Sequence, residues 1–184
     1  MIKEGFLAGL MKYNVWNKLV ARRLYTESGL RFPAGHGMGE DMTMIALATH
    51  ATRTAHVAKP LYHYVKINSN AFSNTFSQRH LDDIRFNADR TLTLLQDWNA
   101  PDKERYLNFF KLNLKLPFLF SEDRSRIRLW KAWYPEANRY IRQNAHQPRR
   151  TRLVQQWAVA GLFPLVRLYT FLVNHLYYGL RYRR

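Results

Sequence analysis

The sequence predicts an α/β remnant, that is, part of a larger α/β fold, and one that is predominantly helical. A region with a few short strands comes first, and a helical C-terminal region follows. The strands are expected within residues 1–76, where two extended stretches, Ala55–Ala58 and Leu61–Val65, flank Pro60. From Leu81 onward, apolar residues recur at helical spacing. With 184 residues, the chain can form one domain, or one and a half, with a substantial core.

The first segments alternate between helix and extended chain. Apolar side chains at helical spacing predict an amphipathic helix over residues 1–12. A second helix is expected over residues 18–26 and stops before Gly29, because glycine is common just past the last helical turn. Leu30–Pro33 is expected to be extended, since a residue before proline disfavours the helical region.

Three glycines lie in the loop of residues 34–39 and predict an unusual turn. The loop leads to two adjacent acids, Glu40 and Asp41, at the start of a helix over residues 42–50. Aspartate is a common N-cap residue, so its position here is compatible with capping as well as with chemistry. The sequence leaves both roles open for Asp41.

Residues 77–150 are expected to be mainly helical. Ser77 is the expected N-cap of a first helix in this region. Its apolar face comprises Leu81, Ile84, Ala88, Leu92 and Leu95. Pro101 suits the first turn of the next helix, whose buried side comprises Tyr106, Phe109, Phe110 and Leu114.

Positive charge is concentrated in the C-terminal half. The net charge is +16, and nine arginines but no acid follow Glu136. Residues 151–184 are strongly apolar, but Pro164 and Arg167 interrupt them, and an arginine central in a spanning helix costs about 2.5–3.5 kcal/mol. We therefore expect an amphipathic tail that lies in the interface of an anionic membrane surface.

The chain has no cysteine, which excludes disulfides, thiol catalysis and cysteine-bound zinc. No signal-peptide pattern is visible at the N-terminus. Together with the basic tail, these features favour a cytoplasmic protein, peripheral on the inner face of the cell membrane.

Four short motifs follow one another: Val15–Leu19 (VWNKL), Arg31–Pro33 (RFP), Gly39–Asp41 (GED) and Lys59–Val65 (KPLYHYV). Their order and spacing resemble the acceptor-side half of a family 2 glycosyltransferase of the GT-A fold. The resemblance covers residues 14–75. It implies a partial GT-A acceptor-side region over residues 1–76, followed by the helical region of residues 77–150 and the interfacial tail of residues 151–184.

In that family a nucleotide-binding half comes first and carries a paired-acid motif that holds a divalent metal. No adjacent acid pair of this chain follows an apolar strand. The resemblance thus implies the C-terminal part of a longer enzyme, inactive by itself, with Mg²⁺ or Mn²⁺ bound outside this chain. The implied reaction is inverting transfer of a sugar from a nucleotide-sugar donor to a cell-envelope glycan of the lipopolysaccharide or exopolysaccharide type.

The aspartate of the family's E-D pair is its catalytic base, and the matching residue here is Asp41. Glu40 lies beside it, and a second carboxylate this close is expected to raise the pKa of one of the two. Such a shift helps a carboxylate act as a base near neutral pH.

Six further residues are candidates for substrate binding, each with a structural alternative. Trp16 either stacks on a sugar ring or fills the core, and Lys18 either neutralises a diphosphate or faces water. His36 lies in the glycine loop, and His63 lies within the second extended stretch, between Tyr62 and Tyr64, where a structural role is the simpler reading. Lys66 and Ser69 lie where the family places a phosphate-binding loop, although lysine replaces the commoner arginine.

Two other functions remain open. A pI near 10.4 and interleaved arginines and aromatics are also typical of nucleic-acid-binding proteins. A non-catalytic remnant that binds only a membrane surface or a partner subunit is the other alternative.

Overall fold

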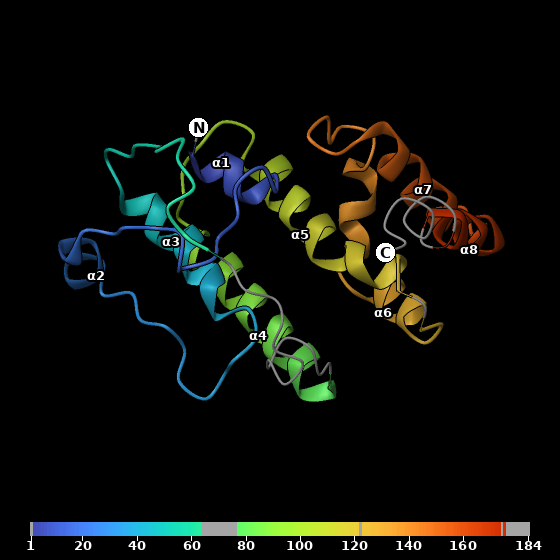
Figure 1. The fold of residues 1–184 in the computed structure, drawn as a ribbon, viewed down its shortest axis with the longest axis horizontal. Helices are drawn as coiled ribbons and strands as arrows, with labels where there is room; N and C mark the ends of the chain where they lie inside the picture. Colours follow the sequence, from blue (N-terminus) through green and yellow to red (C-terminus); the bar gives the residue numbers. More distant parts are fainter. Residues whose placement is uncertain (1, 64–76, 122, 174, 176–184) are drawn as a thin grey trace. The chain divides into compact units, whose positions relative to one another are not determined.

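The structure is a computed structural model that describes residues 2–63, 77–121, 123–173 and 175 (Figure 1). Within these ranges all regular structure is helical, so the predominantly α part of the prediction is confirmed and the predicted strands are wrong. Residues 55–58 and 61–63 run exposed and irregular. A strand exists only through hydrogen bonds to a neighbour, and these stretches have none in the described structure. Residues 64 and 65 of the second stretch lie outside the described residues.

The chain divides into two compact units, each with its own core. The first unit comprises Met1–Phe6 and Met11–Pro101, and the second comprises Leu7–Leu10 and Asp102–Arg184. The helical elements up to Pro101 are α1 (Ile2–Leu7), α2 (Arg22–Ser28), the 3₁₀ helix η1 (Glu40–Met42), α3 (Thr43–His50) and α4 (Gln78–Leu94). Those that follow are α5 (Lys103–Leu119), α6 (Arg126–Ala132), the 3₁₀ helix η3 (Pro135–Tyr140), α7 (Arg149–Val159) and α8 (Phe163–Phe171).

The core of the first unit is built around α3. Its residues Thr43 to Leu47 are all buried, so this short helix is surrounded on nearly every side. Helix α2 contributes no fully buried residue and ends as predicted at Gly29, which adopts a left-handed conformation with φ of 66°. One core cluster contains Leu30, Met44, Ala46 and Leu47, with Tyr13, Val20, Leu24 and Tyr25 packed against it.

Helix α4 packs against α3 and η1 and is capped as predicted. The Ser77 hydroxyl accepts the backbone N–H of His80, and the His80 ring accepts the backbone N–H of Ser77. This reciprocal capping box satisfies two donors that a helix start otherwise leaves open. The face that α4 buries includes polar as well as apolar residues: Leu81, Asp83, Asn87, Ala88 and Thr91.

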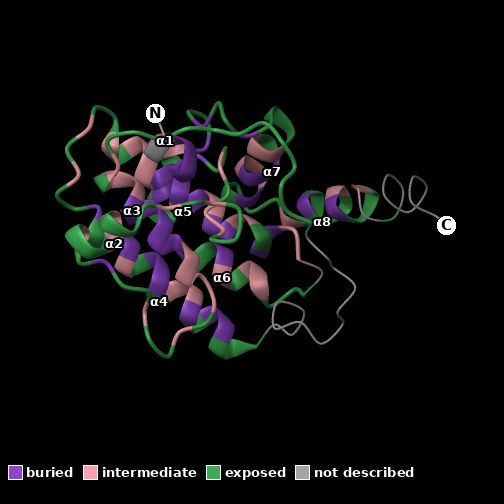
Figure 2. Ribbon diagram, turned by 60° about the vertical axis from the view of Figure 1, so that its left-hand side comes forward, coloured by how far each residue is buried: buried purple, intermediate pink, exposed green. Residues whose placement is uncertain are grey.

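The second unit has an aromatic core. Helix α5 packs against α6 and η3, and its Phe109 and Phe110 are almost fully buried. Trp130 of α6 is 1% exposed. The buried ammonium of Lys115 lies over its ring, at 4.5 Å from the ring centre. Figure 2 shows the buried bands along α5 and α6 and the exposed outer side of α8.

Helices α7 and α8 pack against each other, and a break separates them. Gly161 has a φ of 78°, and Pro164 occupies the first turn of α8, as the sequence predicted for a break near this proline. In the part of the chain that the structure describes, no helix combines the length and the apolar character needed to cross a membrane.

Candidate functional site

The glycine loop of residues 34–39 is fastened to α4 through a buried carboxylate. Asp83 is 6% exposed and accepts the backbone N–H of Gly37 at 3.1 Å, while His36 Nδ1 lies 2.9 Å from its other oxygen. The His36 ring also stacks on Phe86, with ring centres 3.7 Å apart and an interplanar angle of 7°. Burial alone would raise the pKa of Asp83, but the Gly37, His36 and Met38 contacts outweigh it and lower the pKa.

Two more α4 side chains hold the rest of the same loop. The Asn87 amide donates to the Met38 carbonyl at 2.8 Å. The Arg90 guanidinium donates to the Arg31 carbonyl at 2.6 Å and to the Thr43 hydroxyl at 3.1 Å. Residues 83, 87 and 90 share one face of the helix, so a single helix edge fixes both ends of the loop.

Gly39 makes the sharp turn that delivers the acids. Its φ is 81°, and a Cβ added there would lie 2.9 Å from Met42 Cε and 3.4 Å from Asn87 Cβ. Side chains rarely adopt this backbone conformation, and the available space is also closed. The sequence signal of three glycines therefore corresponds at Gly39 to a real steric requirement.

Glu40 and Asp41 are the first two residues of η1. Neither end of η1 nor the start of α3 has a side-chain capping hydrogen bond, so the carboxylate of Asp41 is not used as a helix cap. Burial and, second, the negative charge of Glu40 together raise the pKa of Asp41 to about 6, while a hydrogen bond from its own backbone N–H and the charge of Lys18 oppose the shift. A half-buried carboxylate with a pKa near 6 is a group suited to accept a proton near neutral pH.

Lys18 lies close enough to Asp41 to affect the pKa of its carboxyl group, but the ammonium of Lys18 is already hydrogen-bonded to residues that precede it in the chain. It donates to the Asn14 carbonyl at 2.6 Å, to Asn17 Oδ1 at 2.7 Å and to the carbonyl of Lys12. These three bonds use all three of its donors. The pKa of Lys18 is lowered by burial, which the charge of Asp41 partly offsets.

Tyr13 is the third group at this site. Burial and, to a smaller extent, the nearby charge of Asp41 together raise its pKa to about 12. The phenol is therefore protonated throughout the neutral range. This neighbour was not predicted, because Tyr13 lies 28 residues before Asp41 and belongs to the apolar cluster around α3.

Trp16 and Tyr62 form an exposed aromatic pair. Their rings are stacked with centres 4.6 Å apart and an interplanar angle of 28°, and the residues are 41% and 54% exposed. The alternative that Trp16 fills the core is therefore wrong. Exposed stacked rings of this kind provide a flat apolar surface on which a sugar ring can lie. Tyr62 was not among the predicted site residues, although it belongs to the KPLYHYV motif.

The other predicted residues are distributed differently. His36 turns to Asp83 on α4, and His63 is exposed at the end of the irregular segment that carries Tyr62. Lys66 and Ser69 lie outside the described residues. The structure thus brings together Asp41, Glu40 and Lys18, adds Tyr13 to them, and places Trp16 in the turn that Lys18 closes.

The described ranges contain no group of three or more His, Asp or Glu side chains arranged to hold a metal ion. Glu40 and Asp41 are two adjacent carboxylates and do not form such a group with a third residue among those described. We therefore assign no step to a metal held by the described residues.

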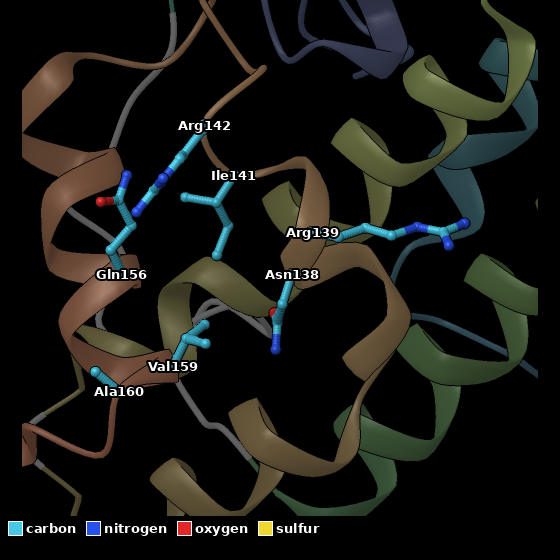
Figure 3. Close-up of a pocket in the computed structure, with 7 residues that line it drawn as sticks. All are labelled: Asn138, Arg139, Ile141, Arg142, Gln156, Val159 and Ala160. Atoms are coloured by element: carbon cyan, nitrogen blue, oxygen red, sulfur yellow. The ribbon is translucent and has the colours of Figure 1, made fainter.

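The second unit contains a hollow of about 330 Å³ between η3 and α7 (Figure 3). Its volume is at the lower end of the range of small-molecule sites. Arg139 directs its guanidinium away from the hollow, where it pairs with Glu104 at 2.6 Å. The lining has no carboxylate, hydroxyl or imidazole: it consists of Asn138, Arg139, Ile141, Arg142, Gln156, Val159 and Ala160. We assign no chemistry to it.

Comparisons with protein-family models, with curated proteins and with solved structures find no match for this chain. The resemblance of residues 14–75 to a glycosyltransferase therefore rests on the order of the motifs and on the site that they form.

Proposed function

We propose that this chain is the acceptor-side part of an inverting glycosyltransferase, with Asp41 as the catalytic base. The observation that carries the proposal is the carboxylate of Asp41, whose pKa is raised to about 6 by burial and by the adjacent Glu40. It is presented by a loop that three α4 side chains hold in place, and it is not used as a helix cap. Strongly shifted carboxyl pKa values cluster at functional sites, which supports a chemical role for Asp41.

In the proposed reaction, an acceptor hydroxyl binds beside Asp41. As its oxygen attacks the anomeric carbon of the donor sugar, the proton passes to a carboxylate oxygen of Asp41. The bond between the anomeric carbon and the donor phosphate oxygen breaks, and the nucleoside diphosphate leaves with the electron pair. Because attack and departure occur on opposite faces, the anomeric configuration is inverted. A base with a pKa near 6 is still mainly ionised at pH 7 and binds the proton more tightly than an ordinary carboxylate.

The stacked pair of Trp16 and Tyr62 is the proposed platform for the acceptor glycan. Its exposed rings offer apolar area to the flat face of a sugar, and Trp16 is joined through its turn to Lys18, whose charge acts on Asp41. Glu40 is the proposed partner that orients the acceptor or Asp41. His63 follows Tyr62 directly and lies at the edge of the platform.

The donor is proposed to bind to a nucleotide-binding half that is not part of these 184 residues and that holds Mg²⁺ or Mn²⁺. The acceptor is proposed to be a cell-envelope glycan of the lipopolysaccharide or exopolysaccharide type. We also propose that the protein works in the cytoplasm as a peripheral protein on the inner face of the cell membrane. Nucleic acid is the alternative partner of its basic surface.

The test is sugar transfer in membranes of a host that lacks the gene and is complemented with the intact gene. Labelled nucleotide-sugars are supplied, and incorporation into envelope glycan is measured for wild type, Asp41→Asn and Asp82→Asn. Asp82 is an exposed acid on α4, so Asp82→Asn is the matched control. Loss of the base is expected to lower transfer by about 10²–10⁴-fold. Full transfer by Asp41→Asn would contradict the assignment.

A binding experiment tests the platform without needing the donor half. Trp16→Ala and Tyr62→Ala are expected to remove binding of envelope oligosaccharide, measured by titration calorimetry, while Asp41→Asn retains it. Equal binding by Trp16→Ala and wild type would place the acceptor elsewhere.

A further inference from the structure

Helix α8 of the second unit has an apolar side that is largely exposed in the described structure, where only the ring of His175 stacks on that of Phe171. Its inner side is fixed to the unit, since Val166 is 1% exposed and Thr170 is 9% exposed. Its outer side carries a row of large apolar residues spaced at three- and four-residue intervals, so they share one face. They are Leu165 (43% exposed), Leu168 (54%), Phe171 (54%) and Leu172 (41%). We call this row the outer face of α8.

Positive charge predominates in the unit that carries this face. Residues 102–184 contain seventeen Lys and Arg against five Asp and Glu, which gives the second unit a net charge of +12. Four of the five acids are already paired within the unit, with Arg105, Lys111, Arg126 and Arg139. Arg167 is exposed on α8 itself, and the ammonium of Lys131 lies 4.5 Å from the ring centre of Phe163 at the start of α8.

We propose that the outer face of α8 inserts into the surface of an anionic lipid bilayer, with Arg167 contacting lipid phosphates. An apolar row beside the exposed Arg167 matches the two layers of such a surface, with acyl chains below and phosphates above. A nucleic acid would satisfy the charge but would leave the apolar row in water. The inference deepens the peripheral location proposed above and does not depend on the transfer reaction.

The geometry fits a helix that lies in the surface. Helix α8 has nine residues and is about 14 Å long at 1.5 Å per residue, less than half of the hydrocarbon thickness of about 30 Å. Its buried side holds it on the second unit, so that side cannot turn toward lipid. Only the outer face can enter the membrane, and it can do so to the depth of its side chains.

The experiment uses the absence of cysteine from the chain. Leu168→Cys and, as a control, Leu19→Cys on the first unit are each labelled with an environment-sensitive fluorophore. Leu19 is also an exposed leucine, at 104% relative exposure. On adding mixed vesicles of phosphatidylcholine and the anionic lipid phosphatidylglycerol, the label at position 168 is expected to brighten and shift to the blue. The label at position 19 is expected not to change.

A co-sedimentation series with the same vesicles separates the apolar contribution from the electrostatic one. Leu165→Ser/Leu168→Ser is expected to bind about tenfold or more weakly than wild type, while the matched pair Leu19→Ser/Leu61→Ser binds normally. Both pairs replace exposed leucines, and circular dichroism checks that each variant is folded. Raising salt is expected to weaken wild-type binding without abolishing it, because the apolar contribution is not screened.

The outcomes distinguish this inference from the proposed location. If wild type binds anionic vesicles and Leu165→Ser/Leu168→Ser binds equally well, another surface makes the contact and the inference about α8 is wrong. If wild type does not bind vesicles at about 0.1 M salt but binds duplex DNA with a steep salt dependence, both the proposed membrane location and the inference about α8 are wrong. A dimer that dissociates on Leu165→Ser/Leu168→Ser, without vesicle binding, would assign the face to a second copy and also overturn the inference.

Discussion

The two units use buried polar groups in different ways. In the first unit, Asp83, Asn87 and Arg90 of α4 hold a loop that has little regular structure and that ends at Asp41. In the second unit, the buried ammonium of Lys115 donates to the carbonyls of Trp133 and Tyr134 and secures packing among aromatic rings. The difference indicates that the first unit is organised to present a side chain, and the second to provide a rigid base for α7 and α8.

The largest expected effect is that of a substitution in the aromatic core of the second unit. Trp130 is 1% exposed, and Trp130→Ala is expected to lower the free energy of unfolding by about 3–5 kcal/mol. Trp16→Ala, at a tryptophan that is 41% exposed, is expected to cost less than about 1 kcal/mol. Urea unfolding followed by circular dichroism measures both. Similar losses for the two tryptophans would show that the exposed aromatic pair is part of the structural framework.

The second prediction concerns Lys115 and pH. Burial lowers its pKa to about 8, against 10.5 in the unfolded chain, with Glu136 opposing the shift. Between pH 8 and 10 the unfolded chain therefore binds more protons than the folded chain, so stability is expected to rise as pH increases. The full shift corresponds to about 3 kcal/mol. Above pH 10 the raised pKa of Tyr13 acts in the opposite direction, because its folded form keeps a proton that the unfolded form loses.

Lys115→Met is the matched variant for that measurement. It keeps the length of the side chain and removes the titrating group. The unfolding free energy of this variant, measured at pH 7, 8, 9 and 10, is therefore expected to rise much less with pH than that of wild type. A rise of the same size in Lys115→Met would mean that other groups cause it.

The smallest effect tests the turn before Asp41. Gly39→Ala is expected to cost about 2 kcal/mol, since the left-handed conformation costs about 1–2 kcal/mol for a side chain and the contact with Met42 adds to it. Gly35 has a φ of 79° but no atom within 4 Å of an added Cβ, so Gly35→Ala is expected to cost about 1 kcal/mol. The difference between the two, from chemical denaturation, isolates the close contact. Equal losses of unfolding free energy in the two variants would show that the close contact with Met42 does not require glycine at position 39.

Local features could be predicted from the sequence because they depend on neighbouring residues. The end of α2 at Gly29, the cap at Ser77 and the break near Pro164 all follow from local backbone rules, and the structure confirms them. The effect of Glu40 on the pKa of Asp41 was also expected, because the two acids are adjacent. Burial, which is the larger cause of that shift, could not be read from adjacency.

Features that depend on distant partners were missed or wrong. Strands were predicted at residues 55–58 and 61–65 from local pattern alone. Pairing requires a second strand, and the described part of these stretches, residues 55–58 and 61–63, has none. The anchoring of the loop by Asp83 and Asn87 joins residues 46 to 49 positions apart. A periodicity search limited to apolar residues passes over these polar groups on the buried face of α4. The stacking of Tyr62 on Trp16 was missed for the same reason of distance.

The most direct test of the account is the titration of the Asp41 carboxyl group by ¹³C NMR, with the signal assigned from its absence in Asp41→Asn. The structure predicts a pKa of about 6. A value near 4, as for an ordinary exposed aspartate, would mean that the site neither buries Asp41 nor couples it to Glu40, and the proposed base would be ruled out.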